Sequence, residues 1–169
     1  MGSQHPLHFD AIAEARRQWE SHRWGAPAAM AAVTSIMRVQ QIVIARVDEA
    51  LRPFDLTFAR YEALVLLYFS RRGELPMGKM GDRLMLHPTS VTNIIDRLEQ
   101  QGLARRIPHP TDRRTVLAQV TDDGRQVVEK ATEAVTAVEF GIGVLPEGDL
   151  DRLTELLRQL RVDAGDFPT

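Results

Sequence analysis

The sequence of 169 residues has 21 Lys and Arg against 23 Asp and Glu, a formal net charge of −2, and no cysteine. This length fits one domain, or one small domain with helical extensions, and the 44% apolar and 26% charged residues allow a full core and exclude a disordered chain. The lack of cysteine excludes disulfides, thiolate metal sites and thiol redox switches. Uninterrupted apolar runs fall far short of the roughly 20 residues of a membrane span, and no signal peptide opens the chain. We therefore expect a cytoplasmic protein with no membrane partner.

The N-terminal part of the chain is expected to be helical after an irregular start. Residues 1–9 lack periodicity, which predicts a disordered tail or the remnant of a tag. Apolar residues at helical spacing predict a short helix over 10–22 and a long helix over 28–51. Pro53 ends the long helix.

The next helix is expected to begin after Thr57, because threonine is a favourable N-cap residue. Gly73 is placed to be its C′ residue, where a left-handed conformation is common. Residues 74–76 read as a short extended link to the following helix.

A short helix over 77–84, a tight turn and a longer helix over 89–101 follow, with Pro88 at the first helical position. This order describes a helix-turn-helix. The first turns of a recognition helix need small polar side chains that reach base edges and phosphates. The candidate DNA-contacting residues on this helix are Thr89, Ser90, Thr92, Asn93 and Arg97. A polar first turn can also be only a helix cap, so the segment that follows decides between the two interpretations.

From Leu103 the apolar period changes from about 3.6 to about 2, which predicts two strands over 103–107 and 116–120 joined by a turn-rich tip. Four arginines and one acid give residues 103–121 a net charge of +3: Arg105, Arg106, Arg113, Arg114 and Asp112. A charged hairpin is often simply solvated. After a helix-turn-helix, however, it indicates a wing whose arginines suit a narrow minor groove.

The C-terminal part is again helical. Thr121 is expected to cap a helix that runs to about Phe140, and Pro146 opens a last helix with one leucine stripe. The apolar stripes over 30–47 and 150–160 suit helices that bury against a second subunit. An intramolecular core is the alternative explanation for both stripes.

The distribution of charge removes the apparent objection to a nucleic-acid partner. Residues 1–121 carry 16 basic and 12 acidic side chains, a net charge of +4. Residues 122–169 carry 5 basic and 11 acidic side chains, a net charge of −6. Basic charge is thus concentrated in the part that contains the predicted helix-turn-helix and wing.

Two stretches, 86–103 and 112–121, resemble the MarR family of winged helix-turn-helix regulators, and the overall similarity covers roughly 30–162. The second stretch resembles the family's wing, with an Asp, an Arg two positions on and a closing Thr. The resemblance implies a homodimer on a palindromic operator, with the recognition helix in the major groove and Arg114 in the minor groove. It also implies that Asp112 orients Arg114 through a salt bridge and that Arg113 lies near phosphate.

The expected fold is therefore mainly α with a small β-hairpin wing. We expect N-terminal dimerisation helices over 10–55, a winged helix-turn-helix DNA-binding lobe over 56–121 and C-terminal dimerisation helices over 122–169.

The resemblance also implies a ligand, because family members often bind aromatic acids or phenols between the dimerisation helices and the DNA-binding lobe. The candidate pocket residues are Trp19, Met30, Met37, Arg38, Arg60, Tyr61, Glu62 and Phe69. A Met or aromatic stripe at helical spacing is more often core. The first helix with Trp19 resembles the family's urate-responsive branch, but Glu62 replaces an Asp and Ile94 an Arg of that branch. Branches that sense oxidation through cysteine are excluded.

The leading hypothesis is a dimeric, sequence-specific DNA-binding regulator, a repressor released by a small aromatic or phenolic-type ligand. The alternative is a winged-helix module for architectural DNA binding or protein interaction, without an effector. The sequence shows no phosphate-binding glycine loop, nucleophile elbow or metal cluster. We therefore expect no enzymatic activity, no cofactor and no metal.

Overall fold

The computed structural model describes residues 7–168, and the chain divides into two compact units, one up to Ala45 and one from Arg46 onward. Most of the tail expected over residues 1–9 lies outside the described residues. Leu7 and Phe9, at its end, are exposed.

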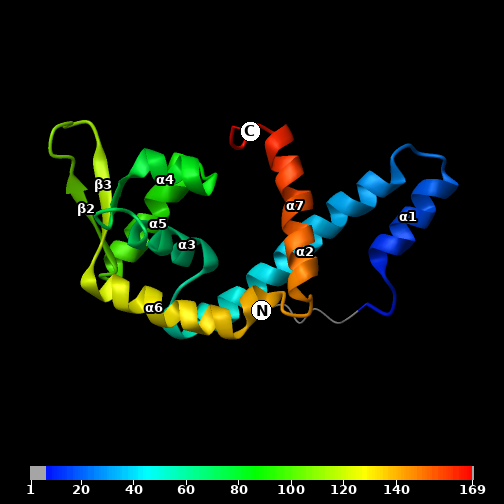
Figure 1. Cartoon of the computed structure of the whole chain (residues 1–169), viewed down its shortest axis with the longest axis horizontal. Helices are drawn as coiled ribbons and strands as arrows, with labels where there is room; N and C mark the ends of the chain where they lie inside the picture. The colour runs from blue at the N-terminus through cyan, green and yellow to red at the C-terminus, as the bar shows by residue number, and fades with distance from the viewer. Residues whose placement is uncertain (1–6, 169) are drawn as a thin grey trace. The chain divides into compact units, whose positions relative to one another are not determined.

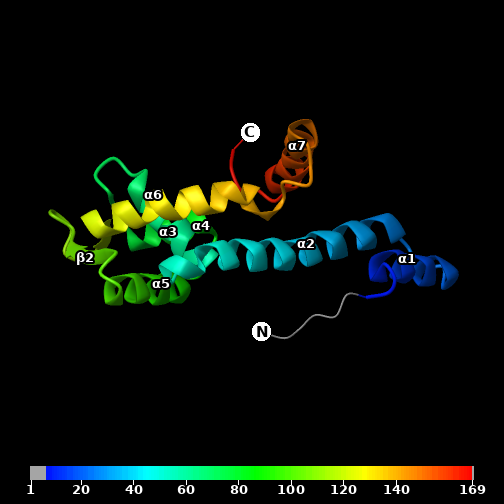
Figure 2. The ribbon, with the colours of Figure 1, turned by 90° about the horizontal axis from the view of Figure 1, so that it is seen from below.

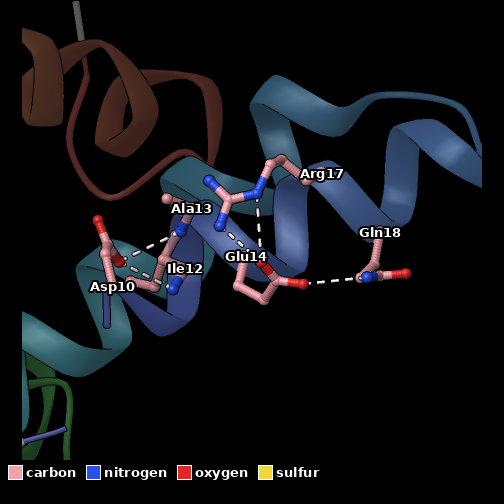
Figure 3. A network of polar contacts seen from close by, with 6 residues as sticks. All are labelled: Asp10, Ile12, Ala13, Glu14, Arg17 and Gln18. Carbon is pink, nitrogen blue, oxygen red and sulfur yellow. Dashed lines mark hydrogen bonds and ion pairs between the residues drawn. The ribbon is translucent and has the colours of Figure 1, made fainter. Parts of the chain in front are cut away.

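The first unit contains helix α1 (Ala11–Ser21) and most of helix α2 (Pro27–Leu51). The carboxylate of Asp10 accepts hydrogen bonds from the N–H groups of Ile12 and Ala13, which caps the first turn of α1 (Figure 3). The polar side of α1 is linked by bonds from Arg17 and Gln18 to Glu14, also drawn in Figure 3. These contacts stabilise α1 locally.

Trp19 ties the end of α1 to the turn before α2. Its indole N–H donates to the carbonyl oxygen of Gly25 at 2.9 Å. Its ring meets that of Trp24 edge to face, with ring centres 4.8 Å apart. Within its own unit, Trp19 therefore holds a turn.

Helix α2 is long and unusually apolar on its surface. Together with the turn that follows, the stretch Pro27–Phe54 is long and apolar enough to cross a membrane by length and composition alone. An 18-residue window within this stretch has a mean hydropathy of 1.4, and none of that window is buried. Uninterrupted apolar runs in the sequence do not indicate this stretch, because polar residues such as Arg38 and Gln40 interrupt it. Val33 and Met37 on this helix are more than half exposed, at 54% and 57%.

The second unit contains the remaining elements. In chain order they are η1 (Arg52–Phe54), α3 (Phe58–Tyr68), β1 (Glu74–Pro76), α4 (Met77–Leu84), α5 (Pro88–Gln100), β2 (Ala104–Pro108), β3 (Val116–Val120), α6 (Asp122–Ala137), η2 (Glu139–Gly141) and α7 (Glu147–Asp163). The chain is mostly helical with one small antiparallel sheet, so the predicted fold class is confirmed.

The sheet has three strands in the order β1-β3-β2. Strand β3 lies in the centre, where Ala118 pairs with Leu75 of β1 and with Arg106 of β2. The sequence predicted the hairpin β2–β3, which Figure 1 shows at the edge of this unit beside α5. The link over 74–76 was predicted as extended but not as a third strand.

The core of the second unit surrounds α3, which lies between α5 and α6 (Figure 2). Leu64 and Leu67 of α3 have no exposed surface, and neither have Ile95 of α5 and Val135 of α6. Burial of such side chains stabilises the fold by about 1.5–3 kcal/mol each. The positions of α5 and the wing thus depend on one shared core.

The ends of α3 differ from the prediction. Thr57 is the N-cap residue as expected, but its side chain makes no capping bond, and the carboxylate of Asp48 instead accepts from the N–H of Phe58 at 2.6 Å. The helix ends at Tyr68, so Gly73 is not its C′ residue. Gly73 has φ +70° and lies in the turn that leads into β1.

Candidate nucleic-acid interface

Helices α4 and α5 form the predicted helix-turn-helix, and the turn between them is tightly organised. The chain passes through Met85, which is left-handed at φ 51°, and the N–H of Leu86 donates to the carbonyl oxygen of Gly81 at 2.9 Å. Met80 of α4 and Val91 of α5 are buried. Because these contacts fix the inner face of α5, its other face is left for solvent or a ligand.

The outer face of α5 carries the residues predicted to contact DNA. Four of them are exposed and one is partly buried: Thr89, Thr92, Asn93, Arg97 and, partly buried, Ser90. The hydroxyl of Thr92 donates to the carbonyl oxygen of Pro88 at 3.0 Å, which leaves its oxygen able to accept. The amide of Asn93 makes no hydrogen bond to any described residue. Both its donor and its acceptor are available for a base edge.

The wing tip is ordered by two side chains that bind its backbone. Asp112 accepts from the N–H of Arg114 at 3.0 Å and from the hydroxyl of Thr115 at 2.7 Å. These bonds, the Thr115 bond foremost, lower the pKa of the Asp112 carboxyl. His109 Nδ1 lies 3.1 Å from the N–H of Asp112 and accepts from it. Arg113 next to it is exposed.

The role of Asp112 differs in mechanism from the expectation. Within residues 7–168 its carboxylate forms no salt bridge with the Arg114 guanidinium. It acts on the main chain of the tip instead, which fixes where the side chains of Arg113 and Arg114 begin and leaves both exposed. An ordered tip with two unpaired cations suits insertion into a groove of high negative potential.

Arg106 connects the wing to the recognition helix. Its guanidinium pairs with Asp96 at 2.7 Å and with Glu99, both on α5, and approaches the carbonyl oxygen of Thr92 at 3.3 Å. Glu99 also accepts from the backbone N–H of Arg106 at 2.7 Å. The Arg106 side chain is only 27% exposed. Arg106 was predicted as a DNA contact, and the structure gives it a second role in holding α5 against β2.

The other cations lie on the outer surface of the lobe. Arg105 donates to the side-chain oxygen of Gln119 at 2.8 Å and is exposed. Three further arginines, which were not predicted as DNA contacts, border a hollow of about 510 Å³ beside β1 and α4: Arg71, Arg72 and Arg83. None of the three forms an ion pair with a described residue. Their clustering within thirteen residues of sequence was the available signal.

The predicted pocket residues fall into separate places. Tyr61, Glu62 and Phe69 line one cavity between α3 and α6. Arg60 borders a different hollow, together with Arg97. The remaining candidates lie in the first unit: Trp19, Met30, Met37 and Arg38. Within the second unit, the cavity therefore contains the predicted aromatic residues and the acid but not the predicted cation Arg60.

Known proteins that are similar to this chain are transcriptional regulators. The MarR family model matches residues 56–116. The HTH-type transcriptional regulator YhbI of Bacillus subtilis is 36% identical over 110 residues, which cover 65% of this chain and 68% of that protein. The crystal structure of Sco5413, a MarR family transcriptional regulator from Streptomyces coelicolor, is 54% identical, covers 84% of this chain and 99% of its own, and has a TM-score of 0.79. A mutant MarR from E. coli complexed with operator DNA is 25% identical, covers 75% and 91%, and has a TM-score of 0.68.

Proposed function

Because this chain belongs to the MarR family of transcriptional regulators, we propose that it is a dimeric, cytoplasmic repressor that binds a palindromic operator in double-stranded DNA and is released by a small aromatic ligand. The single observation that carries the proposal is the pairing of an unpartnered Asn93 on the exposed face of α5 with a structured wing tip that exposes two arginines. The first can read a base, and the second can enter a minor groove.

The contacts divide into readout and positioning. Thr89, Ser90, Thr92, Asn93 and Arg97 are proposed to meet the major groove, and Arg114 the minor groove. Arg113 and Arg105 are proposed to contact phosphate, and Arg106 to hold the wing against α5. The exposed arginines around β1 add positive charge that attracts the duplex.

The composition of the exposed surface of α2 favours contact with a second subunit over contact with a lipid bilayer. Its exposed apolar side chains alternate with polar residues such as Gln40 and Gln41, which a lipid environment would leave without partners. A dimer would place its two helix-turn-helix units on half-sites about 10 base pairs apart. The relatives are regulators, and we propose that this chain has no catalytic activity either.

The test is a salt-dependent titration of the full chain against DNA from upstream of its own gene and against random DNA of equal length. We expect specific binding about 10³-fold or more above random binding, and a steep fall in affinity with salt. Equal affinity for both DNAs would favour the architectural or protein-interaction alternative.

A further inference from the structure

The cavity between α3 and α6 has an unusual combination of walls, with aromatic rings on several sides and carboxylates at its border. Its volume is about 620 Å³. The rings belong to Phe58, Tyr61, Tyr68, Phe69 and Phe140, and the carboxylates to Glu62, Glu129 and Glu133. No Lys, Arg or His lines it.

The hydroxyl groups in the cavity already have partners. Tyr61 and Thr132 share a hydrogen bond at 2.9 Å, and Tyr68 donates to Glu129 at 3.0 Å. This bond to Glu129 raises the pKa of the Tyr68 hydroxyl. The polar groups of these side chains are thus directed at one another, which leaves ring faces and edges for a ligand.

Two of the three carboxylates lack a neutralising partner. Glu62 and Glu133 form no hydrogen bond or ion pair with any described residue. Burial raises the pKa of Glu62, because its charge is partly removed from water without compensation. The guanidinium of Arg125 lies 5.8 Å from the centre of the Tyr68 ring, but Arg125 does not line the cavity.

This chemistry selects the charge of the occupant. An aromatic acid would bring its own carboxylate beside those of Glu62, Glu129 and Glu133, and Coulomb repulsion among like charges opposes this. A cation with an apolar body would instead meet carboxylates and the negative faces of aromatic rings at once. We propose that the cavity between α3 and α6 binds an aromatic organic cation, such as an aryl-substituted quaternary ammonium or a protonated aromatic amine.

A regulatory consequence follows if the proposed function holds, since it rests on operator binding. Helix α3 packs against α4 and α5 on one side and against α6 on the other. A ligand that separates α3 from α6 changes the support of the helix-turn-helix. It lowers operator affinity to the extent that it prefers a non-binding arrangement.

The binding test uses two ions of nearly equal size and shape but opposite charge, tetraphenylphosphonium and tetraphenylborate. Calorimetric titration of the full chain is expected to show saturable binding of the cation and at least about tenfold weaker binding of the anion. Equal affinity for both would mean that only the apolar walls matter, and no saturation with the cation would leave the cavity without this ligand class. Either result overturns the proposal.

Variants locate the site. Glu62→Gln and Glu133→Gln are each expected to weaken cation binding about fivefold to tenfold, and Phe69→Ala to weaken both ions. The matched control is Glu155→Gln on α7, which removes the same charge outside the cavity. An equal loss in the control would mean that the cation responds to net charge alone, and the assigned site would be wrong.

A separate measurement addresses regulation. Operator affinity is measured with and without tetraphenylphosphonium, and the variants are first shown to bind operator like the parent chain. A cation that binds in the calorimeter but leaves operator affinity unchanged would overturn the regulatory consequence alone. Failure of the parent chain to bind any operator would overturn the proposed function but not the cation site. If the cation dissociates a dimer in sedimentation, a second copy of the chain is the natural occupant and the proposal is wrong.

Discussion

Several leucine side chains of the DNA-binding lobe are fully buried, whereas most leucine side chains of helix α7 are exposed. In the lobe, Leu64, Leu67 and Leu98 have no exposed surface. In α7, Leu156 and Leu160 are 53% and 59% exposed, and the helix contains no buried residue. The lobe therefore satisfies its apolar surface within one chain, whereas α7 leaves a stripe that a single copy does not cover.

The same contrast applies to helix α2 in the first unit. Val33, Met37 and Val39 are about half exposed, while Val47 and Leu51, at its other end, are buried in the second unit. Exposed apolar stripes of this length mark interaction surfaces. The proposed DNA contacts and the proposed assembly surfaces thus lie on different helices, so substitutions can separate the two functions.

The largest effect is expected from placing charge on the α7 stripe. The double substitution Leu156→Glu and Leu160→Glu should abolish the dimer and lower operator affinity about a hundredfold or more. The reason is that two separate subunits no longer bind the two half-sites of one operator as a linked pair. The fold of the lobe should survive, since neither side chain is buried. Sedimentation gives the oligomeric state, and fluorescence anisotropy gives the DNA affinity.

The control for this experiment is Gln159→Glu, which adds a charge to an exposed position of the same helix. It should leave the dimer intact. A dimer that persists in the double variant would show that the α7 stripe is not an assembly surface, and the contrast with the lobe would need another explanation.

The second prediction tests the lobe. Arg106→Ala removes the guanidinium that pairs with Asp96 and Glu99 and leaves two carboxylates without their cation. We expect a loss of about 2 kcal/mol in the free energy of unfolding. Thermal denaturation measures it, and sedimentation should show an unchanged dimer. Arg105→Ala removes an exposed guanidinium that has a single bond to Gln119 and should cost much less. Equal losses of unfolding free energy in the two variants would show that the Arg106 ion pairs do not hold the wing against α5.

Local periodicity and cap chemistry were enough to predict the elements of the lobe. Helix α4 and strand β3 have the predicted bounds, and α5 begins at Pro88, the predicted first helical position. Thr121 caps α6 through a bond from the N–H of Gly124, as a threonine before a helix predicts. These features depend on residues close in sequence, so a single sequence contains them.

Contacts between distant segments were not predictable in the same way. Strand β1 has three residues and ends in proline, and it becomes a strand only because β3, over 40 positions later, pairs with it. The pairing of Arg106 with α5 likewise requires the tertiary position of β2. Tyr61, Glu62 and Phe69 of the cavity were predicted because they lie close together in the sequence. The acids of α6 were not predicted, because the helix-turn-helix and the wing separate α3 from α6 in the sequence.

The third prediction tests the readout by α5. Asn93→Ala should lower discrimination at one operator position by about 1–3 kcal/mol, because the amide then no longer pairs with a base. Competition between operators substituted one base pair at a time measures it. Gln126→Ala, an exposed amide on α6 outside the helix-turn-helix, should leave base preference unchanged. If both variants keep the parent preference, Asn93 does not read a base.

A smaller and less specific effect is expected from the wing. Arg114→Ala should weaken binding to all operators, flatten the preference for narrow-groove flanks and reduce the salt slope by about 1. Titrations at several salt concentrations measure this. Asp112→Ala should produce a similar loss while Arg114 is retained, because the tip then lacks the bond to its backbone N–H. Unchanged affinity in both variants would show that the wing does not enter the groove.

The smallest effect concerns stability at the cavity between α3 and α6. Burial raises the pKa of Glu62 above its value in the unfolded chain, so the folded state prefers the protonated, neutral form. The charged form present at neutral pH therefore destabilises the fold, and Glu62→Gln should slightly raise the melting temperature at pH 7. The difference should vanish as the pH falls and the parent carboxyl takes up its proton. Glu155→Gln, on exposed α7, should show no such gain, and a loss of stability in Glu62→Gln would mean that this carboxylate supports the fold.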